Sequence, residues 1–184
     1  MLFSGSKDKK GKKGKQKSRQ VIIKDATKKL SQNPHNPDGL IPLADLYYQE
    51  HSWDKALPLY DTMVNIAVAH SEIDLAEASL RQGICAIKLG KYEESLKGLL
   101  QARKINPDAF EPNFYLGQSF LHSKEYDKSI PLLRKALTIN KDVPEIYKYL
   151  GLALYQNHNF KESLPYLKKA LDVTPDDKEL LFSM

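Results

Sequence analysis

The stretch FEPNFYLGQSFLHSKEYDKSIPLLRKALTINKDV, residues 110–143, decides the fold because its pattern recurs on both sides at a fixed spacing. The preceding copy spans 76–109 and the following copy spans 144–177, so the period is 34 residues. A glycine, an aromatic residue, a serine, a leucine and an alanine recur at the same offsets. They are Gly83, Gly117 and Gly151; Tyr92, Tyr126 and Phe160; Ser95, Ser129 and Ser163; Leu99, Leu133 and Leu167; and Ala102, Ala136 and Ala170. This period predicts a helix–turn–helix unit that stacks on copies of itself.

The sizes of the recurring side chains fit two antiparallel helices in each copy, over roughly positions 2–14 and roughly positions 17–30. Glycine and serine leave room where the two helix axes come closest, while the aromatic residue and leucine fill the space where the helices diverge. Pro107 and Pro175 cannot continue a helix, so they mark its end in two copies.

An Asp-x-x-Glu pattern recurs in step with the repeat and predicts four capping boxes at helix starts. In such a box the aspartate accepts hydrogen bonds from first-turn amides and the glutamate offsets the positive end of the helix. The pairs are Asp74–Glu77, Asp108–Glu111, Asp142–Glu145 and Asp176–Glu179.

The regions on either side of the strict copies continue the pattern less regularly. Residues 37–75 form a looser copy, and residues 21–32 fit a single helix that stops before Pro34. Residues 178–184 start a further repeat, in which Leu180, Leu181 and Phe182 form a poor polar cap. We therefore expect either that the chain is the N-terminal portion of a longer repeat protein or that this end packs on another copy in a homo-oligomer.

The pattern resembles the tetratricopeptide repeat (TPR) family over about residues 21–184. It departs from the family pattern at Gln82, where leucine is usual, at Ala86, where an aromatic residue is usual, and at Lys141, where the terminal proline is missing. The resemblance implies an all-α, right-handed superhelical solenoid of antiparallel helix pairs. It also implies a concave groove, lined by the first helix of each repeat, that holds a partner peptide or helix.

The groove positions of the family are carried over to this chain residue by residue. They fall on Tyr48, Gln49, Arg81, Ile84, Lys88, Phe114, Tyr115, Gln118, His122, Lys148, Tyr149, Leu152, Tyr155 and Gln156. The lysine and asparagine pattern with which some family members clamp a free carboxylate is absent, because Asp45, Ile84, Gln118 and Leu152 occupy its central position. We therefore do not expect recognition of an acidic C-terminus.

The positive charge is concentrated at one end of the chain. The formal net charge is +5, but residues 1–20 hold eight bases and one acid, a net of +7, which leaves −2 for the rest. We expect residues 1–20 to be a disordered basic tail, since they have nothing to bury. The polybasic cluster is Lys9, Lys10, Lys12, Lys13, Lys15 and Lys17. Its target stays open: none, an anionic lipid surface, a protein, or nucleic acid, which lacks support because no aromatic residues are interleaved.

The sequence contains no pattern that predicts catalysis or a cofactor. The five histidines show no metal-ligand spacing, no glycine-rich loop follows a predicted strand, and no nucleophile motif is present. We therefore expect no enzyme activity, metal or cofactor. The single cysteine, Cys85, predicts a buried structural thiol and a reducing compartment, so we expect a cytoplasmic protein, with the inner membrane surface as an option for the tail.

The sequence therefore predicts a protein–protein interaction scaffold or adaptor that holds a partner segment in the groove. Two alternatives stay open: a membrane-surface or nucleic-acid-associated factor tethered by the tail, and a self-assembling subunit of a larger complex. Replacing Tyr149 and Phe114 together by alanine is expected to weaken a groove partner without unfolding the chain.

Overall fold

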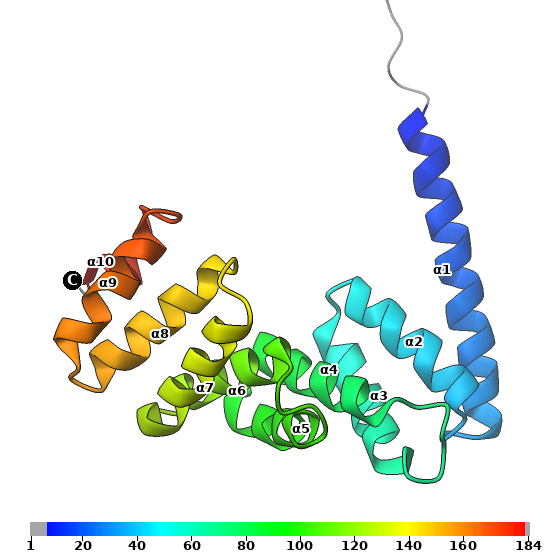
Figure 1. Cartoon of the computed structure of the whole chain (residues 1–184). Helices are drawn as coiled ribbons and strands as arrows, with labels where there is room; N and C mark the ends of the chain where they lie inside the picture. Colours follow the sequence, from blue (N-terminus) through cyan, green and yellow to red (C-terminus); the bar gives the residue numbers. More distant parts are fainter. Residues whose placement is uncertain (1–6, 183–184) are drawn as a thin grey trace, which may run out of the picture. The chain divides into compact units, whose positions relative to one another are not determined.

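The structure, a computed structural model, describes residues 7–182, and side chains from residue 18 onward. Within this range every regular element is an α-helix, which confirms the all-α prediction (Figure 1). Contacts within the chain divide it into two units, one up to Ala78 and one from Ser79, and we describe each by itself.

The first unit contains three helices that pack consecutively: α1 (Lys7–Gln32), α2 (Pro37–Gln49) and α3 (Trp53–Ile66). Asn36 caps α2, because its side-chain oxygen accepts a hydrogen bond from the backbone N–H of Asp38 at 2.9 Å. The core of this unit contains both small and large apolar side chains. Its buried members include Ala26, Leu40, Ala44, Ala56 and Tyr60.

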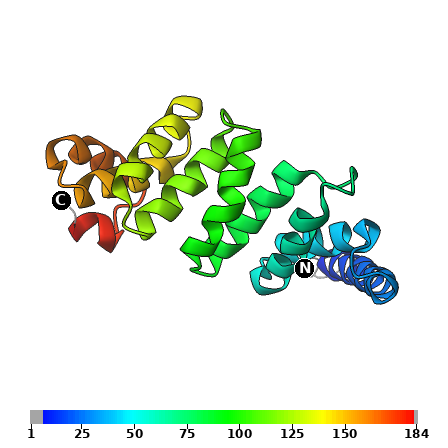
Figure 2. The same ribbon diagram turned by 90° about the horizontal axis from the view of Figure 1, so that it is seen from below.

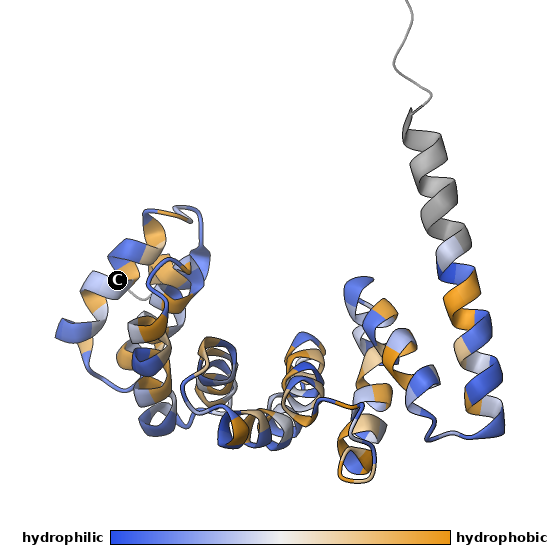
Figure 3. Cartoon of the chain, turned by 45° about the vertical axis from the view of Figure 1, so that its right-hand side comes forward, coloured by the Kyte–Doolittle hydropathy of each residue, from blue (hydrophilic) through white to orange (hydrophobic). Residues whose placement is uncertain are grey.

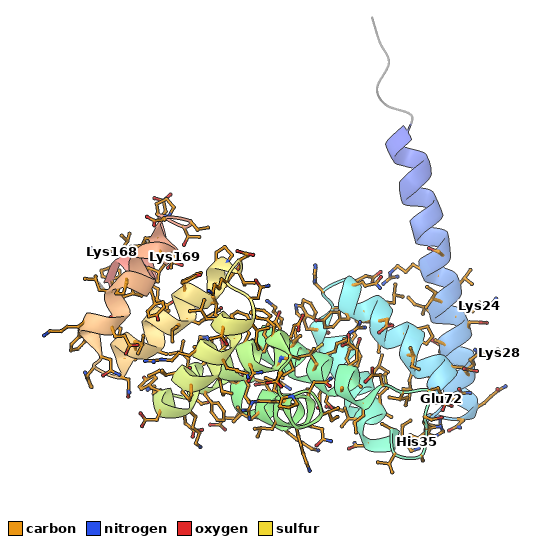
Figure 4. All side chains as sticks on the ribbon, in the orientation of Figure 1. Lys24, Lys28, His35, Glu72, Lys168 and Lys169 are labelled. Carbon is orange, nitrogen blue, oxygen red and sulfur yellow. The ribbon has the colours of Figure 1, made fainter. Side chains whose placement is uncertain are left out.

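Helix α1 differs from the prediction, because it begins at Lys7 and not at residue 21. The expected disorder is thus contradicted over residues 7–20, and residues 1–6 lie outside the described part of the chain. Lysine, arginine and glutamine are good helix formers, and extending a helix that already packs on α2 costs less than nucleating a new one. Arg19 also ties this stretch to α2, since its Nε lies 2.6 Å from Glu50 Oε1. Lys24 and Lys28 point away from α2 (Figure 4).

Helix α4 (Leu75–Lys88) begins in the first unit and continues into the second. The remaining helices of the second unit follow one another in chain order (Figure 2). Their bounds are α5 (Tyr92–Ile105), α6 (Phe110–His122), α7 (Tyr126–Ile139), α8 (Pro144–Gln156), α9 (Phe160–Leu171) and α10 (Lys178–Phe182). Apolar residues gather along the helices and hydrophilic ones at many of the turns (Figure 3).

The close contact predicted between the two helices of a repeat is confirmed. A Cβ atom on Gly117 would lie 2.7 Å from Leu133 Cγ, closer than side-chain atoms pack. Ser129 Oγ donates a hydrogen bond to the carbonyl oxygen of Gly117 at 2.7 Å, so the two backbones meet there. Gly83 and Gly151 contact Leu99 and Leu167 in the same way.

The departure at Gln82 is compensated on the facing helix. Gln82 Oε1 would lie 2.5 Å from a Cβ atom on Gly98, so the glycine leaves the space that the longer glutamine side chain fills. The equivalent pair in the next repeat is Leu116 and Leu132, which are both buried in one apolar cluster. The sequence therefore keeps the packed volume while changing both partners.

Three of the four predicted capping boxes are wrong. Asp74 accepts hydrogen bonds from the N–H groups of Ala76 and Glu77 at 2.9 and 3.1 Å, as predicted. Helices α6 and α8 begin after Ala109 and Val143, which have no capping side chain. At α10 the cap is Asp177, one residue later than predicted. An extended residue separates Asp108 and Asp142 from the helices that they were expected to cap, so these aspartates cannot reach the first-turn amides.

The turns between paired helices share one backbone conformation. The same position in each turn lies in the left-handed region: His51 at φ 57°, Gly90 at 73°, Lys124 at 62° and His158 at 61°. Only one of the four is a glycine, so three turns hold a side chain where it costs energy.

Candidate partner-binding groove

The candidate groove in the second unit is built by side chains on α6 and α8, which pack against each other. Phe114, Gln118 and His122 are four residues apart on α6 and therefore share one face of that helix. All three meet Tyr149 of α8. Gln118 Nε2 donates to Tyr149 Oη at 2.7 Å, and the ring centroids of Phe114 and His122 lie 5.7 and 6.4 Å from that of Tyr149.

A residue that the sequence analysis assigned only to helix packing also belongs here. Tyr92, the first residue of α5, stacks on His122 with 4.0 Å between ring centroids and 11° between ring planes. Tyr92, His122 and Tyr149 therefore form a row of rings across three helices. The distance from Tyr92 to His122 in the chain gave no indication of this contact, because it depends on how α5 docks beside α6.

His122 separates two depressions in the surface of the second unit. The larger, of about 440 Å³, is lined by Gly90, Lys91, Tyr92, Glu93, Glu94, His122 and Ser123. The smaller, of about 230 Å³, is lined by Leu121, His122, Lys124, Tyr126, Tyr149, Leu152, Gln156 and Glu179. Three residues of the smaller one besides His122 were predicted for the groove: Tyr149, Leu152 and Gln156.

Lys148, which was predicted to face a partner, forms ion pairs within the chain. Lys148 Nζ lies 2.7 Å from Asp177 Oδ2 and 3.0 Å from Glu179 Oε2, so it holds α10 against α8. Burial acts to lower the pKa of Lys148, but the hydrogen bonds and charges of Asp177 and Glu179 outweigh it and raise that pKa. The hydrogen bond from Lys148 lowers the pKa of Asp177.

Burial sets the protonation of the rings in the groove. It lowers the pKa of His122, against a smaller raising effect of Glu179, so the neutral imidazole is favoured. Burial raises the pKa of Tyr115, and the charges of Glu111 and Glu145 add to this effect. Burial likewise raises the pKa of Tyr149. These groups are therefore neutral near pH 7 and can act as hydrogen-bonding, ring-faced contacts.

Several predicted groove residues are placed in the packed interior. Phe114 is 7% exposed, Leu152 3% and Ile84 6%, so these side chains form the floor of the groove at most. Because Phe114 belongs to the apolar core of the second unit, its replacement by alanine would disturb packing, and the double substitution expected to spare the fold is a poor test. Tyr155 packs on Phe160 of α9 with 5.4 Å between ring centroids.

The other predicted residues lie apart from this arrangement. Tyr48 belongs to the first unit, where its ring packs edge-on against Trp53 at 5.2 Å between centroids, and Gln49 is exposed. Arg81 is partly exposed and Lys88 is exposed, and neither lines a depression described above. The side chains of the predicted polybasic cluster lie outside those that the structure describes.

No group of three or more histidine, cysteine, aspartate or glutamate residues among those described could hold a metal ion. Over the same part of the chain, no helix is long and apolar enough to cross a membrane. The buried position predicted for Cys85 is confirmed.

Two family models, both described as tetratricopeptide repeat, match residues 80–144 and 144–177. Together they cover residues 80–177, which is 98 of the 184 residues. The chain belongs to the tetratricopeptide repeat family, as the sequence pattern predicted. Membership supports a protein–protein interaction scaffold, and proteins built from these repeats are generally not enzymes.

Solved structures share the fold at low sequence identity. YrrB, a TPR protein with an unusual peptide-binding site, superimposes with a TM-score of 0.73 at 15% identity over 91% of this chain and 85% of its own. MamA gives 0.69 at 23% identity over 97% and 99% of the two chains. MamA from Desulfovibrio magneticus gives 0.70 at 16% identity over 96% and 99%. The search of curated proteins returned no match.

Proposed function

We propose that this chain is an adaptor that holds a segment of another protein in the groove formed by α6 and α8. The observation that carries the proposal is the row of Tyr92, His122 and Tyr149, with Gln118 hydrogen-bonded to Tyr149. Aromatic rings with a polar edge give large contact area and fixed hydrogen-bonding geometry, which is why they anchor many interfaces. YrrB, which has the same fold, carries a peptide-binding site, and this supports the proposal.

The groove suits a protein segment better than a small molecule. The smaller depression, of about 230 Å³, lies below the range for small-molecule pockets, and the larger, of about 440 Å³, lies in the lower part of that range. Each has room for a side chain, and both share the wall made by His122. A chain segment that presents successive side chains would therefore occupy both.

The test is affinity capture with the full chain, its His122→Ala/Tyr149→Ala variant and a control. The control, Leu100→Ala/Leu164→Ala, removes exposed apolar side chains from α5 and α9, outside the residues that line the groove. We expect some proteins to bind both the wild type and the control but not the groove variant. Circular dichroism verifies that all three are equally helical. A partner set that is the same for all three would contradict the proposal.

A second candidate follows from charge, because residues 1–20 carry a net charge of +7. Such a segment would bind anionic surfaces and lose that binding in high salt. Deleting residues 1–17, which keeps the Arg19–Glu50 ion pair, is the matching test. Loss of sedimentation with phosphatidylserine vesicles on deletion would support membrane association; equal sedimentation of both chains would exclude it.

A further inference from the structure

The two depressions beside His122 have different chemistry, although they share that side chain as a wall. The larger is bordered by two carboxylates, Glu93 and Glu94, in the first turn of α5. The smaller is lined by rings and aliphatic side chains together with Lys124, Gln156 and Glu179. The difference matters because it restricts which neighbouring side chains of a partner can occupy the groove together.

The larger depression is suited to a cation. Lys91 pairs with Glu94 at 3.0 Å, and this leaves Glu93 exposed without an ion pair among the described residues. The stacked rings of Tyr92 and His122 form the adjacent wall, and an aromatic face also attracts a cation. An arginine or lysine of a partner would therefore meet a carboxylate and a ring at the same place.

The smaller depression is suited to an apolar side chain. Leu121 and Leu152 are buried at its base, and the rings of Tyr126 and Tyr149 are partly exposed in its lining. Its one carboxylate, Glu179, is 3.0 Å from Lys148 Nζ and is thereby neutralised within the chain. Lys124 also lines this depression, so a basic side chain would lose hydration here, meet a like charge and gain no free carboxylate.

The wider surroundings of the groove also favour a positively charged partner. Glu111 and Glu145, which flank Tyr115, are exposed, and their charges raise the pKa of that tyrosine. In the predicted capping boxes, Glu111 and Glu145 would have acted at the starts of α6 and α8 together with Asp108 and Asp142. Those aspartates do not cap the two helices, so the boxes do not form. No ion pair within the described residues neutralises either glutamate.

We infer that the partner segment carries a basic side chain next to an apolar one, the first for the larger depression and the second for the smaller. This inference rests on the proposed function and adds the chemistry of the occupant. Charge complementarity carries it, because Glu93 in the larger depression has no ion pair among the described residues while Lys91 is already paired, and the smaller depression contains Lys124 but no free carboxylate.

The experiment is a screen of the full chain against an immobilised array of random peptides of about 12 residues, which span about 40 Å when extended. We expect the bound peptides to be enriched in arginine or lysine within a few positions of leucine, phenylalanine, tyrosine or tryptophan. The strongest binder is then labelled, and its affinity is measured by fluorescence anisotropy against variants.

Three variants separate the two depressions. Glu93→Gln is expected to weaken binding about two- to fivefold, because it removes an exposed ion pair with the partner. Asp172→Asn removes the same charge from an exposed site at the end of α9 and is expected to leave the affinity unchanged. Gln156→Phe, at an exposed position that lines the smaller depression, is expected to weaken binding by filling it, without removing a core contact.

The outcomes distinguish the inference from the proposed function. Selection of acidic peptides, or of lysine-only peptides without apolar residues, would overturn the inference. So would equal effects of Glu93→Gln and Asp172→Asn. If instead no peptide binds, or if Tyr149→Ala leaves the affinity of the best peptide unchanged, the proposed groove itself is wrong.

Discussion

Gly90 lies at φ 73° in the turn between α4 and α5, in space so open that an added Cβ atom would meet nothing within 4 Å. The equivalent residue of the next turn is Lys124, which adopts φ 62° in spite of its side chain. Substitutions at these two residues can therefore distinguish the energetic cost of the backbone conformation from the cost of side-chain crowding. Both residues lie in the second unit.

The first prediction concerns that cost. Gly90→Ala is expected to lower the free energy of unfolding by about 1 kcal/mol, because a Cβ atom is disfavoured in the left-handed region. Lys124→Ala is the control, since it changes the side chain but keeps the conformational cost, and its effect is expected to be within about 0.5 kcal/mol. Urea unfolding followed by circular dichroism measures both. Equal losses for the two variants would contradict the argument.

The second prediction concerns His122. Burial lowers the pKa of this histidine from its ordinary value of 6.5. The unfolded chain then binds this proton more readily than the folded chain does, so the contribution of His122 to stability is full above pH 6.5 and falls as the pH is lowered below it. An NMR titration of the histidine ring protons is expected to show His122 titrating below 6.5. A value at or above 6.5 would mean that the ring is not desolvated between Tyr92 and Tyr149.

At the scale of elements, a glycine on one helix contacts a leucine on the other in each of the three strict repeats, at Gly83, Gly117 and Gly151. The third prediction is that Gly117→Ala costs about 1–3 kcal/mol by overpacking Leu133. Leu133→Ala alone is expected to cost about 2–5 kcal/mol through a cavity. In the double variant the added methyl group occupies part of that cavity, so the loss is expected to be smaller than the sum. Thermal and urea unfolding of the four proteins completes the cycle, and strict additivity would contradict direct contact.

The helix pairs could be predicted from the sequence because size repeats at fixed spacing, as at Gly117, Ser129 and Leu133. The helix starts could be predicted only in part. A capping aspartate acts within one turn, so a shift of one residue is enough to disconnect Asp108 from α6 while Asp74 still caps α4. The pattern Asp-x-x-Glu is the same at both places. The backbone conformation between the aspartate and the first turn of the helix decides whether the cap forms.

At the scale of the whole molecule, the groove proposed here is drawn entirely from residues after Asp74. The fourth prediction is that a fragment of residues 74–184, which keeps the cap of α4, folds and binds the best array peptide within about twofold of the full chain. Stacked repeats contact mainly their neighbours, so a shorter stack retains its local structure. Circular dichroism and fluorescence anisotropy test this. Loss of peptide binding by a folded fragment would place part of the site before Asp74.

The candidate groove was predictable only where helix spacing alone brings side chains together. Phe114, Gln118 and His122 share a face by the geometry of one helix, and they were found. Tyr92 was missed as a groove residue, because its contact with His122 depends on the docking of two helices. Lys148 was expected to face a partner, but ion pairs with Asp177 and Glu179 hold it, and no local pattern records that pairing.

The exchange of size between Gln82 and Gly98 means that the repeats of this chain cannot be shuffled freely. A recombined chain that placed α7 behind α4 would drive the bulk of Leu132 into the amide of Gln82. The opposite graft, α5 behind α6, would leave a hole over Leu116. Side-chain volume thus restricts the order of the repeats, and libraries of rearranged repeats would need to move such partners together.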